Sequence, residues 1–209
     1  MAFFLTLEGP EGSGKTTQIR LLDRALRDRG LRVVCTREPG GSPIGEQIRA
    51  VLHAHENTAM VAQAEVLLFS ADRAQHVHEV IAPALRGGEI VISDRYAEST
   101  LAYQGYGRGL DLEALRRITW FATGGLEPDL VVYLDLPVEE GLARKQRDQA
   151  LGRGEWTRMD EQDVAFHRRV REGYLTMARE APGRWLIVDA GQSIEAVHRA
   201  IMERIDPLL

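Results

Sequence analysis

A glycine-rich loop near the N-terminus constrains this chain more than any other feature. Residues 9–16 read Gly-Pro-Glu-Gly-Ser-Gly-Lys-Thr and satisfy the pattern G-x-x-x-x-G-K-[ST]. An apolar run at residues 3–8 precedes the loop, and apolar residues recur at helical spacing after it. Glycines let backbone N–H groups turn towards phosphate oxygens, and the N-terminus of a following helix favours negative charge there. The loop and its flanks therefore predict that the chain binds a nucleoside triphosphate.

The side chains of the loop suit particular parts of such a nucleotide. The ammonium group of Lys15 suits the β and γ phosphates, and the hydroxyl group of Thr16 suits a Mg²⁺ ion. We expect the nucleotide to contact Gly9, Pro10, Glu11, Gly12, Ser13, Gly14, Lys15, Thr16 and Thr17. The sequence has neither the N-K-x-D motif of GTPases nor the LSGGQ-like motif of ABC-type ATPases. A small phosphotransferase is the class that remains.

Five short apolar runs alternate with segments of helical periodicity. The runs that predict strands are residues 3–8, 31–36, 89–93, 130–135 and 185–189. One predicted helix begins at Lys15, and another begins at Pro43 with Ser42 as its N-cap. The other segments that predict helices cover residues 61–85, 111–122, 138–149, 161–179 and 193–205. Continuous apolar strands separated by helices are typical of a parallel sheet covered on both faces. We expect a single α/β domain over residues 1–209.

Composition and charge narrow the class of partner. Hydrophobic residues make up 44% of the chain and the formal net charge is -5, which gives no general attraction for nucleic acids or anionic membranes. No segment predicts a membrane span or a signal peptide. Cys35 is the single cysteine, so an intrachain disulfide is impossible and a reduced, cytoplasmic setting fits. The pairs His53/His55 and His76/His78 are two residues apart, which directs them to different helix faces and argues against a metal site.

Polar residues follow the predicted strands where a doubly wound sheet binds its ligands. Asp94 and Arg95 end the third strand, where Asp94 could hold Mg²⁺ or help to activate an acceptor and Arg95 could bind an acceptor phosphate. Phe69 and Arg73 are four residues apart on one predicted helix, so they share a face that suits a planar base with a carbonyl edge. Core packing of Phe69 and a salt bridge of Arg95 to a neighbouring carboxylate are the alternatives.

Five segments spread over essentially the whole chain resemble the successive motifs of the thymidylate kinase family. They are GPEGSGKTT, TREPGGSPIGEQIR, AEVLLFSADRAQH, ISDRYAESTLAYQGYGRGL and PDLVVYLDLP. The resemblance implies a P-loop kinase fold with strand order 2-3-1-4-5. It also implies transfer of the ATP γ-phosphoryl group to dTMP, which yields dTDP for dTTP synthesis, with Mg²⁺ as cofactor. The family forms homodimers through helices on one side of the sheet, so a homodimer is expected.

The resemblance assigns acceptor contacts residue by residue. Glu11 corresponds to the acidic loop residue that reaches the 3′-hydroxyl of the acceptor sugar, and Arg95 to the arginine that holds the dTMP phosphate. Phe69 corresponds to the ring that stacks on thymine, and Arg73 to the guanidinium at its carbonyl edge. Tyr103 corresponds to the tyrosine beneath the sugar that disfavours a 2′-hydroxyl. The remaining expected dTMP contacts are Thr100, which faces the base, Gln104 nearby, Arg37, Pro39 and Ser99.

The resemblance also predicts a mobile lid at about residues 144–158, which carries Arg144, Arg147, Arg153 and Arg158. One branch of the family has an arginine inside the phosphate loop, but this chain has Gly12 there, so it resembles the branch whose catalytic arginine lies in the lid. We assign that role to Arg153, with Lys15, Arg95 and Glu11 as the other catalytic residues. Because the lid is a few residues longer than is usual, Arg144 and Arg147 remain alternatives. Arg144 and Gln192 are expected on the two sides of adenine.

Two rival interpretations stay open on the sequence alone. The first is a kinase for another nucleoside monophosphate or deoxynucleoside, and dUMP in particular is not excluded. The second is a nucleotide-regulated switch or assembly protein that uses the same loop and hydrolyses ATP slowly without an acceptor. The acceptor motifs and the lid arginines argue against the switch.

Overall fold

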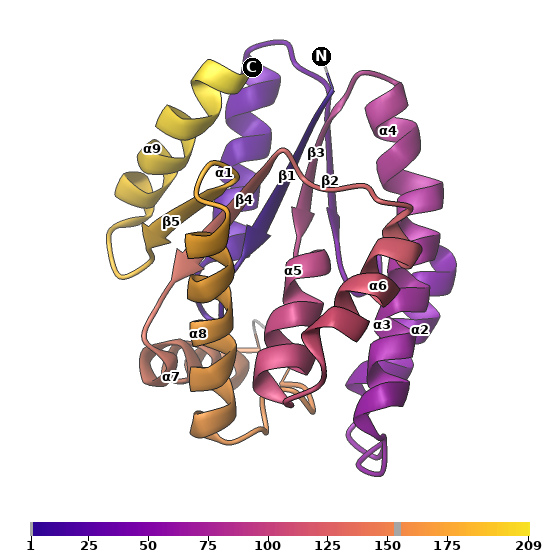
Figure 1. The fold of residues 1–209 in the computed structure, drawn as a ribbon. Helices are drawn as coiled ribbons and strands as arrows, with labels where there is room; N and C mark the ends of the chain where they lie inside the picture. The colour runs from indigo at the N-terminus through magenta and orange to yellow at the C-terminus, as the bar shows by residue number, and fades with distance from the viewer. Residues whose placement is uncertain (1, 153–155) are drawn as a thin grey trace.

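The computed structural model describes residues 2–152 and 156–209 and contains a five-stranded parallel sheet between two layers of helices (Figure 1). The strands are β1 (Phe3–Glu8), β2 (Val33–Arg37), β3 (Ile90–Asp94), β4 (Leu130–Asp135) and β5 (Trp185–Asp189). Their order is β2-β3-β1-β4-β5, and every neighbouring pair is parallel. The predicted α/β class and strand order are therefore confirmed.

The helices lie between successive strands, except the last α-helix, which follows β5. They are α1 (Lys15–Asp28), α2 (Pro43–His53), α3 (Ala62–His76), α4 (Ala82–Arg86), α5 (Ala97–Thr100), α6 (Leu112–Thr123), α7 (Val138–Ala150), α8 (Val164–Glu180) and α9 (Ile194–Ile205). Two π-helical segments, η1 (Val77–Ile81) and η2 (Leu101–Gly107), continue α3 and α5, and the 3₁₀ segment η3 (Asp206–Leu208) follows α9. In the described residues, no helix is both long and apolar enough to cross a membrane.

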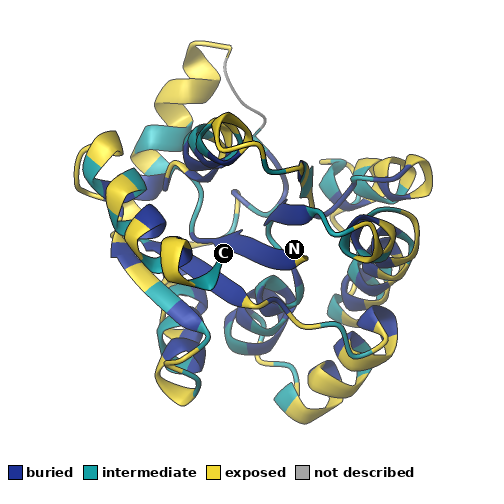
Figure 2. Ribbon diagram, turned by 90° about the horizontal axis from the view of Figure 1, so that it is seen from above, coloured by how far each residue is buried: buried dark blue, intermediate teal, exposed yellow. Residues whose placement is uncertain are grey.

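Alternation along β1 separates the two faces of the sheet. Phe3, Leu5 and Leu7 pack into the apolar cluster that α1 and α9 cover, whereas Phe4 packs on the opposite face against η1 and α4. Figure 2 shows the buried strands between these two helical layers. Successive side chains in a strand point to opposite faces, so Glu8 lies on the same face as Phe4. The sheet thus directs the side chain of Glu8 towards the layer that contains α5, η2 and α8.

The structure modifies the predicted helices in two places. The expected helix over residues 61–85 is present, but it widens into a π-helical turn before Pro83, where the N–H of Ala82 donates to the carbonyl of Val77. Proline lacks an N–H and its ring displaces the carbonyl four residues earlier, which accounts for the wider turn. Residues 97–107 were not predicted as a helix, yet they form α5 and η2.

Tertiary packing explains the helix that the sequence did not predict. The segment contains glycine and aromatic residues of low helix propensity. A Cβ atom at Gly107 would lie 2.7 Å from the ring of Phe166 on α8, so this glycine permits close helix packing. Packing of η2 against α8 therefore outweighs the unfavourable local propensity.

Candidate active site

The phosphate loop lies between β1 and α1 at the carboxyl edge of the sheet, far from both termini (Figure 1). Lys15 is buried, and its ammonium group donates to the carbonyl oxygens of Gly9 and Pro10 at 3.2 Å each. Burial and the nearby charge of Arg95 lower the pKa of Lys15. Gly14 caps α1 in a left-handed conformation. In the described part of the chain the buried hydroxyl of Ser13 has no hydrogen-bond partner, which suits a loop built to receive phosphate oxygens.

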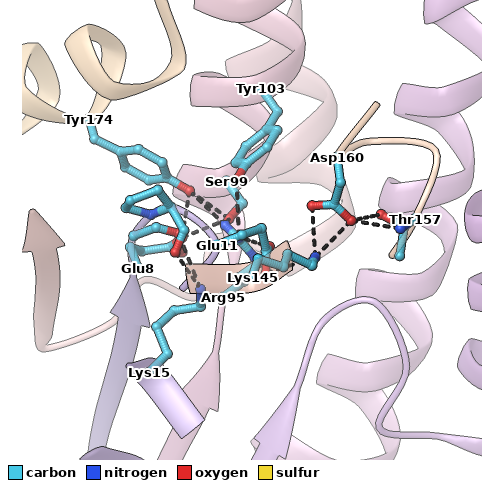
Figure 3. A network of polar contacts seen from close by, with 12 residues as sticks. Glu8, Glu11, Lys15, Arg95, Ser99, Tyr103, Lys145, Thr157, Asp160 and Tyr174 are labelled. Atoms are coloured by element: carbon cyan, nitrogen blue, oxygen red, sulfur yellow. Dashed lines mark hydrogen bonds and ion pairs between the residues drawn. The ribbon is translucent and has the colours of Figure 1, made fainter. Parts of the chain in front are cut away.

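Arg95 brings the predicted acceptor residues to this loop. Its Nη2 atom lies 2.5 Å from Glu11 Oε1 and donates to the hydroxyl of Tyr103 at 3.0 Å, while Nη1 lies 3.3 Å from Ser99 Oγ (Figure 3). The backbone of Arg95 has a positive φ of 71°, which is uncommon for a residue with a side chain and is often found at functional sites. The ion pair that was considered as an alternative role for Arg95 is present, and its partner is Glu11.

Glu11 remains ionised in this setting. Burial raises its pKa, but the positive charges of Lys15, Arg95 and Lys145 outweigh that effect and hold the pKa well below its usual range. The carboxylate therefore stays an acceptor, available to a hydroxyl group of a bound sugar.

A buried carboxylate close to Arg95, that of Glu8, was not predicted from the sequence. Glu8 accepts hydrogen bonds from the backbone N–H of Tyr96, from Ser99 Oγ and from the hydroxyl of Tyr174, at 2.7 to 2.8 Å. Burial raises the pKa of Glu8, and the charge of Arg95 partly offsets this rise. Glu8 thus holds the start of α5 and Tyr174 on α8 in place around Arg95. Its position at the end of an apolar strand was the signal that could have identified it.

Arg73 and Thr100, both predicted as contacts of the base, form a hydrogen bond with each other. The side chain of Arg73 is buried, and it donates to Glu38 Oε2 at 2.8 Å, to Thr100 Oγ1 at 2.9 Å and to the carbonyl of Tyr96 at 2.9 Å. Phe69, one turn earlier on α3, is half-buried and lies outside the three apolar clusters of the described residues. The ring of Phe69 is therefore outside the apolar clusters in which core packing, the alternative role considered for it, would place it.

The loop after β2 is fastened to α3 by a second group of buried polar residues. Asp72 Oδ1 accepts from the backbone N–H of Gly40 at 2.9 Å, and His76 bridges Glu38 Oε1 at 3.0 Å and Thr36 Oγ1 at 2.6 Å. Burial and the negative charge of Glu38 raise the pKa of Asp72 to about 7. These contacts fix Glu38, and through it they fix the guanidinium of Arg73.

Gln104 faces a buried carboxylate on α3. Its amide donates to Glu65 Oε1 at 2.9 Å, and Arg108 and Arg158 contact the same carboxylate, Arg158 at 2.5 Å. Burial raises the pKa of Glu65, but these hydrogen bonds, with that of Arg108 first, lower it overall. Arg158, which we placed in the lid, is thus a buried partner of Glu65. The carboxylate needs such a partner because an unpaired buried carboxylate is costly.

Two other predicted residues, Arg37 and Pro39, lie at the end of β2 and just after it. Arg37 is exposed and forms a two-pronged contact with Glu46 at 2.9 and 3.1 Å. It lines a cleft of about 350 Å³ with Arg49 and Trp156 among the other lining residues. Pro39 is buried, and its carbonyl accepts from Arg49 at 2.9 Å. The backbone of Arg37 pairs in register with Asp94, the residue before Arg95, while its guanidinium contacts Glu46.

A second cleft lies beside the phosphate loop, where adenine was expected. It has a volume of about 150 Å³, and Thr17, Arg144 and Gln192 are among its lining residues. Arg144 Nη1 donates to the carbonyl of Ala190 at 3.2 Å, so the start of the predicted lid and the loop after β5 lie side by side. The two residues expected on either side of adenine thus line one cleft.

Helix α7 packs directly against the phosphate loop. A Cβ atom at Gly12 would lie 2.4 Å from the carbonyl oxygen of Gly141, and one at Gly141 would lie 2.6 Å from that of Glu11. The loop therefore has no room for an arginine at position 12 while α7 holds this place. Arg153, our choice for the catalytic arginine, lies outside the described residues.

Comparison with known proteins gives a consistent result. The family model described as thymidylate kinase matches residues 7–201. A thymidylate kinase of Roseiflexus sp. (strain RS-1) is 50% identical over all of this chain and 96% of its own length, and that of Thermomicrobium roseum is 50% identical over all of this chain and 97% of its own. The crystal structure of a thymidylate kinase from Ehrlichia chaffeensis superposes with a TM-score of 0.77 at 30% identity, covering 97% of this chain and 98% of its own.

Asp72 should make the stability of the protein depend on pH. Its pKa of about 7 in the fold is above the ordinary value of 3.8, so the folded state binds more protons between about pH 4 and 7, and the contribution of Asp72 to stability falls as pH rises through that range. Asp72→Asn removes this contribution. We expect the Tm of the variant minus the Tm of the wild type to be larger at pH 8 than at pH 5. The exposed Asp28→Asn serves as control, and an equal difference at both pH values for Asp72→Asn would contradict the account.

Gly141→Ala tests the contact between α7 and the loop. The added methyl group would push against the backbone of Glu11, and we expect kcat to fall about tenfold or more because small displacements of reacting groups are costly. Gly183→Ala is the matched control, since a Cβ atom there meets nothing within 4 Å. Steady-state kinetics and Tm would be measured for both variants. A folded Gly141→Ala protein with the wild-type kcat would contradict the proposed close contact between α7 and the phosphate loop.

Proposed function

We infer that this chain, which belongs to the thymidylate kinase family, transfers the γ-phosphoryl group of ATP to the phosphate of dTMP and forms dTDP. It is a transferase of nucleotide biosynthesis. The observation that best supports assigning this function to particular residues is the contact between Glu11 and Arg95, at 2.5 Å. This ion pair connects the phosphate loop, which binds ATP in the proposed reaction, to the end of β3, where Arg95 can bind the phosphate of dTMP.

The chemical task is to bring two anionic groups together. Two like charges about 4 Å apart near a protein surface repel by about 4 kcal/mol, and the phosphates carry more than one charge each. Lys15 and Arg95 both lie at this edge of the sheet and supply positive charge. The acceptor oxygen of dTMP is already ionised near neutral pH, so the reaction needs positioning and charge neutralisation rather than a strong general base.

We propose the following roles on the acceptor side. Arg95 holds the dTMP phosphate, and Glu11 accepts a hydrogen bond from the 3′-hydroxyl group. The ring of Phe69 stacks on thymine while Arg73 faces its carbonyl edge. Tyr103, which Arg95 holds through its hydroxyl group, packs beneath the sugar and disfavours ribose. The support for these roles is that Arg95 joins Glu11 to Tyr103 and that Arg73 is fixed one turn from Phe69.

Mg²⁺ is the proposed cofactor, and the residues present fit it. Thr16 is exposed in the first turn of α1, and Asp94 ends β3 beside the loop. A hydroxyl and one carboxylate, together with nucleotide phosphates and water, are the oxygen ligands that Mg²⁺ prefers. When bound, the ion would neutralise developing charge on the phosphates.

We keep residues 144–158 as the proposed lid, with its far end fastened by the contact of Arg158 with Glu65, and Arg153 as the proposed arginine at the transferring phosphoryl group. The support for an arginine from the lid is that α7 excludes a side chain at position 12, so the loop cannot supply that arginine itself. Arg144, at the start of this segment, already lines the cleft proposed for adenine. The lid would then exclude water from the reaction.

We also propose a homodimer in the cytoplasm. The support for the dimer is that two helices in contact carry large exposed apolar side chains, Leu67 on α3 and Trp120 and Phe121 on α6, the last 85% exposed. Exposed apolar side chains that gather on one face can mark interaction surfaces. The support for the location is the free thiol of Cys35.

The function is tested by measuring ADP release from MgATP with dTMP, dUMP, UMP, dCMP, AMP, thymidine or no acceptor. We expect strong stimulation by dTMP, weaker stimulation by dUMP, and none by the others. Stacking on the base and exclusion of the 2′-hydroxyl account for this order. A slow rate that no acceptor changes would instead identify a nucleotide switch.

Two arginine substitutions should separate catalysis from acceptor binding. Arg153→Ala should lower kcat by about two orders of magnitude, as for other arginines at a transferring phosphoryl group, with little change in KM for dTMP.

Arg95→Ala should raise the KM for dTMP, because it removes the phosphate contact. Arg24→Ala, which removes an exposed cation on α1, is the control. An unchanged kcat for the first variant, or an unchanged KM for the second, would remove the corresponding assignment.

A further inference from the structure

Lys145 on α7 reaches the phosphate loop, although no motif in the sequence singled it out. Its ammonium nitrogen lies 3.1 Å from Glu11 Oε2 and 2.7 Å from each carboxylate oxygen of Asp160 (Figure 3). The side chain is only 14% exposed, so the ion pairs are shielded from water. We propose that Lys145 is a positioning residue for the reaction, which acts by fixing the carboxylate of Glu11 towards the sugar of the acceptor. This inference rests on the proposed function.

The backbone of α7 is held where Lys145 can make this contact. Gly141 lies one helical turn before Lys145, on the same face, and its Cα approaches the carbonyl of Glu11 closely enough that a Cβ atom would lie 2.6 Å from it. Gly12 makes the reciprocal approach to Gly141. The helix therefore meets the loop through glycine backbone at one turn and through the lysine side chain at the next.

Asp160 gives Lys145 a fixed anchor on the other side. Its carboxylate is 1% exposed, and it accepts from the backbone N–H and the hydroxyl of Thr157 at 2.7 Å each. Arg158, between these two residues, is held by Glu65 on α3. The lysine is thus tied to a part of the structure that is itself well fastened, and the group it can restrain is the more exposed Glu11, whose side chain is 32% exposed.

The two oxygens of Glu11 are held by different cations. Oε1 contacts Arg95 and Oε2 contacts Lys145, so the plane of the carboxylate is defined from both sides. Without Lys145 the carboxylate can rotate about its remaining contact with Arg95. The loss is specific to whatever group Glu11 binds, which is the 3′-hydroxyl in the proposed site.

The test compares two acceptors, dTMP and 3′-deoxythymidine monophosphate, which lacks the 3′-hydroxyl group. For Lys145→Met we expect kcat/KM to fall about tenfold with dTMP and to change less than about twofold with the 3′-deoxy acceptor, as for loss of one charge-assisted contact. Asp160→Asn should show the same pattern, more weakly. Arg168→Met, which removes an exposed ion pair with Glu139 on α7, should leave both values unchanged. The ratio of the two values in one preparation does not depend on the folded fraction.

The remaining outcomes overturn the proposal. An equal loss with both acceptors would mean that Lys145 acts on the phosphoryl group or on the fold. No loss with dTMP, or no preference of the wild type for dTMP over the 3′-deoxy acceptor, would mean that Glu11 is not positioned by Lys145 for the hydroxyl. A wild-type protein that releases no ADP in response to dTMP is a separate result, because it rejects the proposed function itself.

Discussion

The ion pair between Glu11 and Arg95 is the interaction on which the rest of this site depends. A reaction between two phosphates needs cations, but cations placed at a buried sheet edge need partners of their own. Glu11 provides such a partner for Arg95 at 2.5 Å and for Lys145 at 3.1 Å. Buried carboxylates at Glu8, Glu38 and Glu65 do the same for the surrounding polar groups. The site is thus an array of charges that is balanced before any nucleotide adds more.

The parallel sheet makes this array possible with short connections. The carboxyl ends of β1, β3 and β4 lie next to one another, so the phosphate loop, the Arg95 turn and the entry to α7 all begin at the same edge. Ligand sites in open parallel sheets lie at this edge for the same reason. Residues 84 positions apart, as Glu11 and Arg95 are, come within hydrogen-bond distance.

Local patterns predicted much of this arrangement. The apolar runs located all five strands to within two residues at either end, and the four-residue spacing predicted that Phe69 and Arg73 share a face of α3. The partners of Glu8, Glu11 and Glu65 could not be predicted in the same way. Tyr174, Lys145 and Arg158 lie 166, 134 and 93 positions away from them. Tyr174 and Lys145 look like ordinary helix residues in the sequence, and Arg158 was assigned to the lid instead. Only tertiary packing, which also forms η2, brings them together.

A crystal structure of the protein with dTMP bound would test the account most directly, because it shows both oxygens of Glu11 at once. The account predicts one carboxylate oxygen at about 2.7 Å from the 3′-oxygen of the sugar, with Lys145 still within about 3 Å of the other. The phosphate should lie against Arg95. A Glu11 side chain turned away from the sugar, or a Lys145 ammonium group that has left it, would contradict the central claim.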